Sequence, residues 1–373
     1  MSKKSRKKQT RLNNLLIVLI LATMLLIMST YAWFTANREV GINAINLNVT
    51  TSNGLQISAN GIDWKSVLTN DDLINARGSY DSTRHMGGYP TAVNQLAKDI
   101  APVSSPMTLD DAGHLKMYYG QVDADLSDPS SSTYGQYKLT SSLQTDEATA
   151  AGTWEEDESK NYYVAFDFFL KLGNSEAANL YMAGKVKDTS ASQKGIENAA
   201  RVALVEGTAS SGKTTSEQVT TIQSLDTIGG TVISWEPNND SHTAYAVDNH
   251  QTLGWYYPAV TIATGDNQPV VPWDGVVDEV SDVPLTSCKA ADATYGSHFS
   301  TITPTWSTKK GAVVNNAMPN QLATGVTKYR AYMWVEGQDV DCENYASGSS
   351  LYYEIRFSLD QFTAVLPDVT FGP

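Results

Sequence analysis

Apolar and polar residues alternate along much of the chain, and this pattern predicts β-strands. The alternation begins at residues 40–49, where the apolar parity switches between Ala44 and Ile45, as a β-bulge between two half-buried strands would produce. The pair Asn53-Gly54 follows, which favours a tight hairpin turn, and the alternation resumes directly after it. The sequence therefore predicts that this region opens with a β-meander.

Later segments carry the same signal. In residues 162–172 one parity is wholly apolar, whereas the other includes Asp167 and Lys171. Helical periodicity between such segments is missing, so we expect an all-β fold. The expected architecture is an antiparallel, jelly-roll-like β-sandwich with long loop insertions at about 63–160 and 237–304. Shorter alternating runs predict further strands at residues 180–182, 201–205, 231–235, 328–336 and 351–359.

A hydrophobic segment near the N-terminus carries a targeting signal. Residues 1–11 are basic and residues 12–34 are uncharged, which predicts one N-terminal hydrophobic helix, a cytoplasmic N-terminus and export of residues 35–373. The small residues Thr30 and Ala32 fit a signal-peptidase site, so we expect cleavage after Ala32. A retained transmembrane anchor is the alternative, because the segment is long enough to span a bilayer. Either form is extracytoplasmic, and is secreted or anchored at the cell surface.

The net charge of −14 is the sum of two unlike parts. Six of the 26 Lys and Arg residues precede residue 12, so 20 remain against 40 Asp and Glu residues. An acidic surface of this kind repels phosphates, and we therefore expect no nucleic-acid partner. Divalent cations or basic partners are the natural counter-charges. A solvated acidic coat that keeps the protein soluble is the other interpretation.

Two cysteines, Cys288 and Cys342, are too few for a disulfide framework or a four-cysteine zinc site. Outside the cell they could form one disulfide, which would stabilise the fold by about 4 kcal/mol in the chain-entropy model. Two unpaired thiols are the alternative, because the sequence does not show whether their Cβ atoms approach each other.

Acidic residues cluster directly after the strand predicted at residues 328–336. Asp339, Asp341 and Glu343 could bind Ca²⁺ at extracellular concentrations. Their spacing does not match an EF-hand, so a solvated acidic turn is the alternative. Residues 123–128 hold a second, weaker group of acidic residues. No cofactor other than calcium is expected.

Motifs for nucleotide binding and catalysis give no support for an enzyme. Residues 207–214 match the pattern G-x-x-x-x-G-K-[ST], but a nucleotide-binding loop needs a helix immediately after it. Residues 215–225 are rich in Thr and Gln and predict a weak helix at best, so no nucleotide partner is expected. Neither H-E-x-x-H nor G-x-S-x-G occurs, and we expect no catalytic activity.

Residues 30–35 (TYAWFT) and the alternating strand through Val49 resemble the start of the TasA/camelysin family of exported Gram-positive (Firmicutes) proteins. Residues 163–172 with 201–205, and residues 334–342, are similar to a less characterised set of Firmicutes surface proteins with the same leader. The resemblance is specific over about the first fifty residues.

The resemblance implies a leader cut by a dedicated signal peptidase, followed by a jelly-roll-like sandwich. It also implies assembly into biofilm matrix fibres, in which an N-terminal strand completes the sheet of the next subunit. Camelysin is described as a surface metalloprotease, but no zinc-protease motif is present here and no protease activity is expected. Pairing of the strand within its own subunit is the alternative. The assembly strand would present Val40, Ile42, Ile45, Leu47 and Val49.

The function expected from these observations is that of an exported structural protein of the cell surface or of a biofilm-type extracellular matrix. The expected partners are the membrane, through the N-terminal segment, and further copies of the chain, through β-strand addition. The alternative function is a surface-displayed binding module or adhesin that recognises a glycan or a protein through its long loops.

Overall fold

Nearly all the regular structure is β-strand, and one α-helix, α2 (Asn70–Ala76), occurs within the described part of the chain. The expected all-β class is confirmed. The segment 12–34, which includes Ala32, lies outside the described residues. Among the residues that the structure describes, no helix is long and apolar enough to cross a membrane. The computed structural model describes residues 40–49, 54–76, 96–123, 138–144, 161–191, 194–210, 217, 230–239, 242–243, 273–284, 296–308, 316–339, 341–342, 346 and 348–362.

The first six-stranded sheet, sheet A, has the order β16-β9-β18-β1-β3, with β4 also paired to β1. The first described strand, β1, runs parallel to the last, β18, so the sheet is mixed and the expectation of purely antiparallel pairing was wrong. Local alternation cannot reveal this, because parallel and antiparallel strands carry the same period. The strands are β16 (Asn316–Ala317), β9 (Tyr181–Asp188), β18 (Ser350–Ser358), β1 (Val40–Val49), β3 (Val67–Leu68) and β4 (Asp99–Ile100).

The second six-stranded sheet, sheet B, has the order β15-β11-β10-β17-β8-β2. Strand β2 pairs with β8 and not with β1, so the meander predicted around Asn53-Gly54 is wrong. Gly54 has a positive φ of 78°, as expected of a turn glycine, but the chain passes from sheet A to sheet B there. The strands are β15 (Trp306–Ser307), β11 (Val232–Glu236), β10 (Ala200–Ser210), β17 (Gly325–Val335), β8 (Val164–Leu172) and β2 (Leu55–Ser58).

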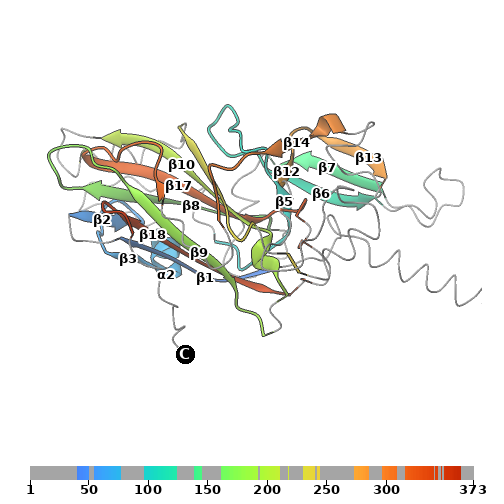
Figure 1. Cartoon of the computed structure of the whole chain (residues 1–373), viewed down its shortest axis with the longest axis horizontal. Coiled ribbons are helices and arrows are strands. Elements are labelled where there is room, and N and C mark those ends of the chain that lie inside the picture. The colour runs from blue at the N-terminus through green and yellow to red at the C-terminus, as the bar shows by residue number, and fades with distance from the viewer. Residues whose placement is uncertain are drawn as a thin grey trace, which may run out of the picture.

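Sheets A and B form two layers that share one hydrophobic core (Figure 1). The rings of Phe168 in β8 and Phe357 in β18 lie 5.5 Å apart across this core. A Cβ atom on Gly184 of β9 would lie 2.8 Å from the Trp235 ring of β11, so the two layers meet closely there. The core therefore depends on side chains that come from both ends of the chain.

The outer face of sheet B is also buried, near one end. Tyr332 and Trp334 of β17 join Val103, Leu115 and Trp273 in a second hydrophobic cluster. The burial of β17 is continuous apart from its first residue, rather than alternating. Polar positions on this face are covered too, which makes sheet B an interior layer over part of its area.

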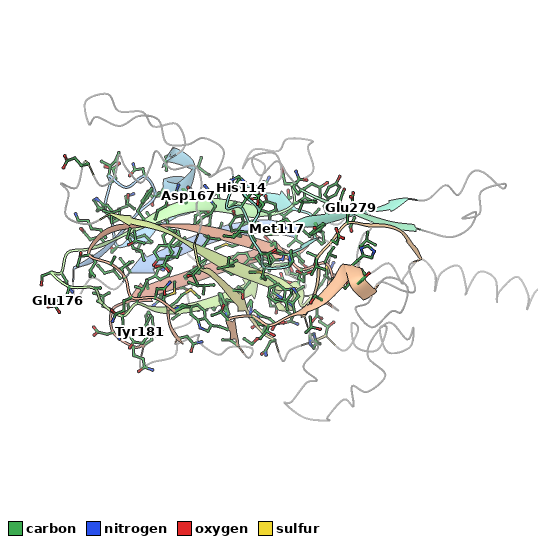
Figure 2. All side chains as sticks on the ribbon, turned by 90° about the horizontal axis from the view of Figure 1, so that it is seen from above. His114, Met117, Asp167, Glu176, Tyr181 and Glu279 are labelled. Atoms are coloured by element: carbon green, nitrogen blue, oxygen red, sulfur yellow. The ribbon has the colours of Figure 1, made fainter. Side chains whose placement is uncertain are left out.

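The covering segments come from both predicted insertions and build a lobe at one end of the molecule (Figure 1). Strand β7 of the first segment pairs with β13 of the second, so the two segments share one sheet, β13-β7-β6-β5. Seen from above, Glu279 of this lobe lies at the opposite end from Glu176 and Tyr181 (Figure 2). The elements of the lobe are β5 (Val103–Ser104), β6 (Tyr118–Asp123), β7 (Lys138–Leu143), β12 (Trp273–Val276), β13 (Val280–Pro284), β14 (Phe299–Ile302) and η4 (Gly296–His298). The short helix η3 (Ile196–Asn198) lies between β9 and β10, and its Ile196 packs into the main core.

The first part of the segment at 63–160 does not belong to the lobe. Strands β3 and β4 pair with β1, and the apolar face of α2 packs into the main core through Leu73 and Ala76. Leu68 and Ile100 lie in the same core. This stretch therefore completes sheet A, and the lobe begins at β5.

Candidate functional site

The strand at residues 40–49 occupies an interior position in sheet A. It lies between β18 on one side and β3 and β4 on the other. The ladder register shifts between Ile42 and Ala44, close to but before the change of parity that the sequence predicts between Ala44 and Ile45. The strand thus pairs within its own subunit in this structure. All five apolar side chains expected to mediate assembly are buried: Val40, Ile42, Ile45, Leu47 and Val49.

Backbone hydrogen bonds hold β1 along both edges. The amide of Gly41 donates to the carbonyl of Ser349 at 2.7 Å, and the amide of Ile42 donates to the backbone carbonyl of Lys98 at 2.6 Å. The amide of Ile45 donates to Oδ1 of Asn70, at the start of α2, at 2.8 Å. Main-chain hydrogen bonds therefore hold β1 on both sides, in addition to its apolar contacts.

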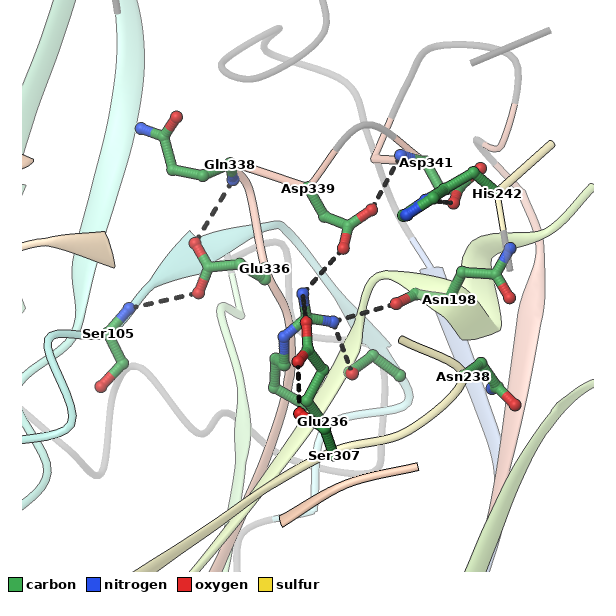
Figure 3. Close-up of polar contacts among 12 residues, drawn as sticks. Ser105, Asn198, Glu236, Asn238, His242, Ser307, Glu336, Gln338, Asp339 and Asp341 are labelled. Atoms are coloured by element: carbon green, nitrogen blue, oxygen red, sulfur yellow. Dashed lines mark hydrogen bonds and ion pairs between the residues drawn. The ribbon is translucent and has the colours of Figure 1, made fainter. Parts of the chain in front are cut away.

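A second site surrounds Arg201 of β10, whose side chain is 2% exposed. Figure 3 shows Glu236, at the end of β11, and Glu336 and Asp339, just beyond β17, in this site. The Nη2 atom of Arg201 lies 2.7 Å from Oδ2 of Asp339 and 3.1 Å from Oε1 of Glu236. Its Nη1 atom donates to the backbone carbonyls of Asn198 at 2.9 Å and Ala200 at 3.0 Å. Two carboxylates and two carbonyls therefore surround the terminal nitrogens of one buried guanidinium, whereas its Nε atom has no hydrogen-bond partner among the described residues.

The lobe contributes to this site through Trp273. The guanidinium carbon of Arg201 lies 4.9 Å from the centre of the Trp273 ring, in a cation–π contact. Ser307 of β15 donates to Oε2 of Glu236 at 2.9 Å and so orients that carboxylate. The arginine thus joins the lobe to sheet B.

Glu336 lies just beyond β17 and is fully buried. Trp334 donates its indole N–H to Oε2 at 3.1 Å, the Ser105 amide donates to Oε2 at 3.4 Å, and the Gln338 amide donates to Oε1 at 3.3 Å. Burial raises the pKa of this carboxyl group to about 7, against a hydrogen bond from Ser104 and the charge of Arg201. Glu336 therefore changes charge near neutral pH.

His242 and Asp341 form the outer end of the site. Nδ1 of His242 lies 2.8 Å from Oδ2 of Asp341, and the Thr243 amide donates to Oδ1 at 2.9 Å. The Asp341 amide in turn donates to Oδ1 of Asp339 at 2.9 Å. Burial alone would lower the pKa of His242, but the hydrogen bond to Asp341 and the charges of Asp339 and Asp341 raise it.

Two of the three residues predicted to bind calcium are therefore close together. Asp339 and Asp341 share one turn, whereas Glu343 lies outside the described residues. The sequence analysis missed Arg201 and His242. Arg201 stands on an ordinary alternating strand, and His242 precedes the acidic turn by almost a hundred residues, so no local spacing connects them.

Other predicted features stay untested or lie outside the described residues. Cys342 is buried in the core, and Cys288 is outside, so the disulfide stays a prediction. The side chains of residues 123–128 also lie outside the described residues, as does Lys213 of the motif at residues 207–214. Strand β10, which leads into that motif, is antiparallel to both β11 and β17, unlike the parallel strand of a nucleotide-binding loop.

Comparison with known proteins gave no match to a family model, a curated protein sequence or a solved structure. The resemblance to the TasA/camelysin family therefore stays a prediction from residues 30–49.

Proposed function

We propose that this protein is an exported structural component of the cell surface or extracellular matrix, built as a β-sandwich and linked into fibres by exchange of strand β1. The observation that carries this proposal is the position of β1. It is the first strand after the leader, yet it fills an interior slot of sheet A and pairs parallel to the last strand, β18.

Several features of β1 favour exchange between subunits. No tight hairpin joins it to β18, β3 or β4, and the next strand in sequence, β2, belongs to the other layer. Removing β1 would expose the edges of its neighbours and a row of apolar sites. The same strand from a second copy would restore both the hydrogen bonds and the buried side chains. Because each copy donates one strand and accepts one, the contact is head-to-tail, and it produces an open fibre when the rotation between successive copies does not close a ring.

The N-terminal sequence supports an extracytoplasmic setting for this assembly. Six basic residues precede the uncharged segment 12–34, and β1 begins six residues after that segment. Cleavage after Ala32 would leave β1 near a new N-terminus, where it can leave one sheet and enter another.

A disulfide placed between β1 and β18 would test the exchange directly. Asn48 and Arg356 are paired in register, and both side chains are half-buried. In the double variant Asn48→Cys with Arg356→Cys, exchange predicts disulfides between subunits and a ladder of covalent multimers on a denaturing, non-reducing gel. The single variants Asn48→Cys and Arg356→Cys control for the native cysteines and should give no ladder.

The same experiment can also reject strand exchange. If the double variant is fully oxidised but migrates as a monomer under conditions in which fibres form, then β1 stays in its own subunit and strand exchange is wrong. If the exported chain forms no fibres and instead retains a specific glycan or protein, the binding-module alternative is favoured.

A further inference from the structure

His242, Asp339 and Asp341 together offer a compact set of metal-ligand atoms. One ligand atom from each residue can be chosen such that all three atoms lie within 4.8 Å of one another. The three side chains are 3%, 6% and 0% exposed. Figure 3 shows the His242 ring beside Asp341, with Asp339 on the same turn. Ligand atoms that each lie about 2.0–2.2 Å from one ion are at most about 4.4 Å apart, so a shift of a few tenths of an ångström suffices to bring all three atoms around a single ion.

Backbone contacts position both halves of this group. Asp339 and Asp341 lie on a turn closed by the Cys342 amide, which donates to the Asp339 carbonyl at 3.0 Å. On the other side, Asn238 turns the chain after β11 with a positive φ of 55°, and its side chain donates to the Glu197 carbonyl at 3.1 Å. Next to His242, the Thr243 amide donates to Oδ1 of Asp341 at 2.9 Å and so holds the imidazole beside the acidic turn.

The balance of charge indicates a cation. The guanidinium of Arg201 contacts both Asp339 and Glu236, so the carboxylates at this point outnumber the cation. Asp341 adds a third carboxyl group, and its titratable cationic neighbour is the imidazole of His242. Buried carboxylates in excess of their counter-charge are unfavourable, and a divalent cation would restore the balance.

We propose that His242, Asp339 and Asp341 bind a divalent transition-metal cation, of which Zn²⁺ is the first choice. Ca²⁺ takes six to eight oxygen ligands, whereas an imidazole with two carboxylates suits zinc or a neighbouring transition metal. The acidic residues alone predicted calcium. Because a histidine joins them, the expected ion is zinc instead. On binding, Nδ1 gives up its proton to solvent and coordinates the ion in place of its hydrogen bond to Asp341.

The residues around the three ligands already hold them in place. Arg201 binds Oδ2 of Asp339 at 2.7 Å, and the Thr243 amide donates to Oδ1 of Asp341 at 2.9 Å. Such contacts orient metal ligands and strengthen binding. The ion would fasten the segment that follows β11 to the turn that follows β17, next to the lobe.

Zinc titration of the full exported chain, purified with a chelator that is then removed, tests the proposal. We expect one Zn²⁺ per chain by calorimetry and by elemental analysis. His242→Gln should weaken binding by about 100-fold or more. The matched control is His114→Gln, which changes another histidine that faces an aspartate, Asp110, at 3.7 Å. This control should bind zinc like the unchanged protein.

The imidazole nitrogen-15 resonances of the unchanged protein provide a readout that does not depend on the variant folding. Zinc should shift the Nδ1 resonance of His242 and leave His114 unaffected. Absence of zinc binding, equal affinity in a folded His242→Gln variant, or zinc binding without a shift at His242 would each overturn the proposal. Binding of Ca²⁺ at these residues without Zn²⁺ would also overturn it.

Discussion

Trp334 donates its indole N–H to the carboxylate of Glu336, two residues further along the chain, at 3.1 Å. Both residues face the lobe side of sheet B, where the end of β17 is covered by β5 and Trp273. An acidic group in this position loses most of its hydration. It is held by hydrogen bonds from the protein instead, and its protonation is therefore linked to folding.

The stability of the protein should fall as the pH rises through neutrality because of Glu336. Folding raises its pKa from 4.5 to about 7, so the native state binds this proton more tightly than the unfolded state. The stabilising contribution is complete below about pH 4.5 and is lost as the pH rises through 7. Glu336→Gln should reduce the difference in unfolding free energy between pH 5 and pH 8 by up to about 3 kcal/mol.

Urea unfolding at both pH values measures this effect, with a chelator present so that metal binding does not contribute. Glutamine keeps an acceptor for the Trp334 and Ser105 N–H groups. An identical pH dependence in the unchanged protein and in Glu336→Gln would show that Glu336 does not titrate in this range.

Asp167 should be among the most sensitive positions of sheet B. Its carboxylate lies 2.7 Å from Nε of Arg330 and 3.0 Å from Nζ of Lys328, and all three side chains are buried. Asp167→Asn removes the carboxylate that the two cations share, and should cost about 3–5 kcal/mol of unfolding free energy. Lys65→Met removes a solvent-exposed ion pair with Asp72 and should cost about 0–1 kcal/mol. Denaturant unfolding measures both variants. Equal losses of unfolding free energy in Asp167→Asn and Lys65→Met would contradict a buried ion-pair network around Asp167.

The contact between the two layers can be tested at Gly184. An added Cβ atom would press on the Trp235 ring of the facing sheet, so Gly184→Ala should cost about 1–3 kcal/mol of unfolding free energy. Gly173→Ala is the matched control, because its Cβ would meet only the Gly54 carbonyl oxygen, at 3.7 Å. Its effect should stay within about 0.5 kcal/mol. A neutral Gly184→Ala variant would mean that the layers do not meet there.

Local pattern was enough to predict the strands of the core. The runs at 162–172, 201–205 and 351–359 correspond to β8, β10 and β18, and the parity switch in β1 corresponds to its register shift. Side-chain alternation depends on each strand's own surroundings, and a single sequence displays it directly.

Pairing partners and the second buried layer could not be predicted in the same way. Strand β1 pairs with β18 from the far end of the chain, and no turn signal connects them. Asp167 lies on the parity of β8 that also carries Lys171, yet it is fully buried, and local alternation does not reveal the cover over that face. Likewise, the acidic pattern indicated Asp339 and Asp341, whereas His242 is distant in sequence and joins them only through its contact with Asp341 in the folded chain.

Electron microscopy of the purified exported chain tests strand-linked assembly most directly. The unchanged chain should form fibres, and Leu47→Asp should abolish them, because burying an unpartnered carboxylate at this fully buried position costs several kcal/mol. Asn43→Asp changes an exposed residue of the same strand and should leave the fibres intact. Monomers of the unchanged chain under all assembly conditions, or fibres of Leu47→Asp as abundant as those of Asn43→Asp, would contradict assembly through β1.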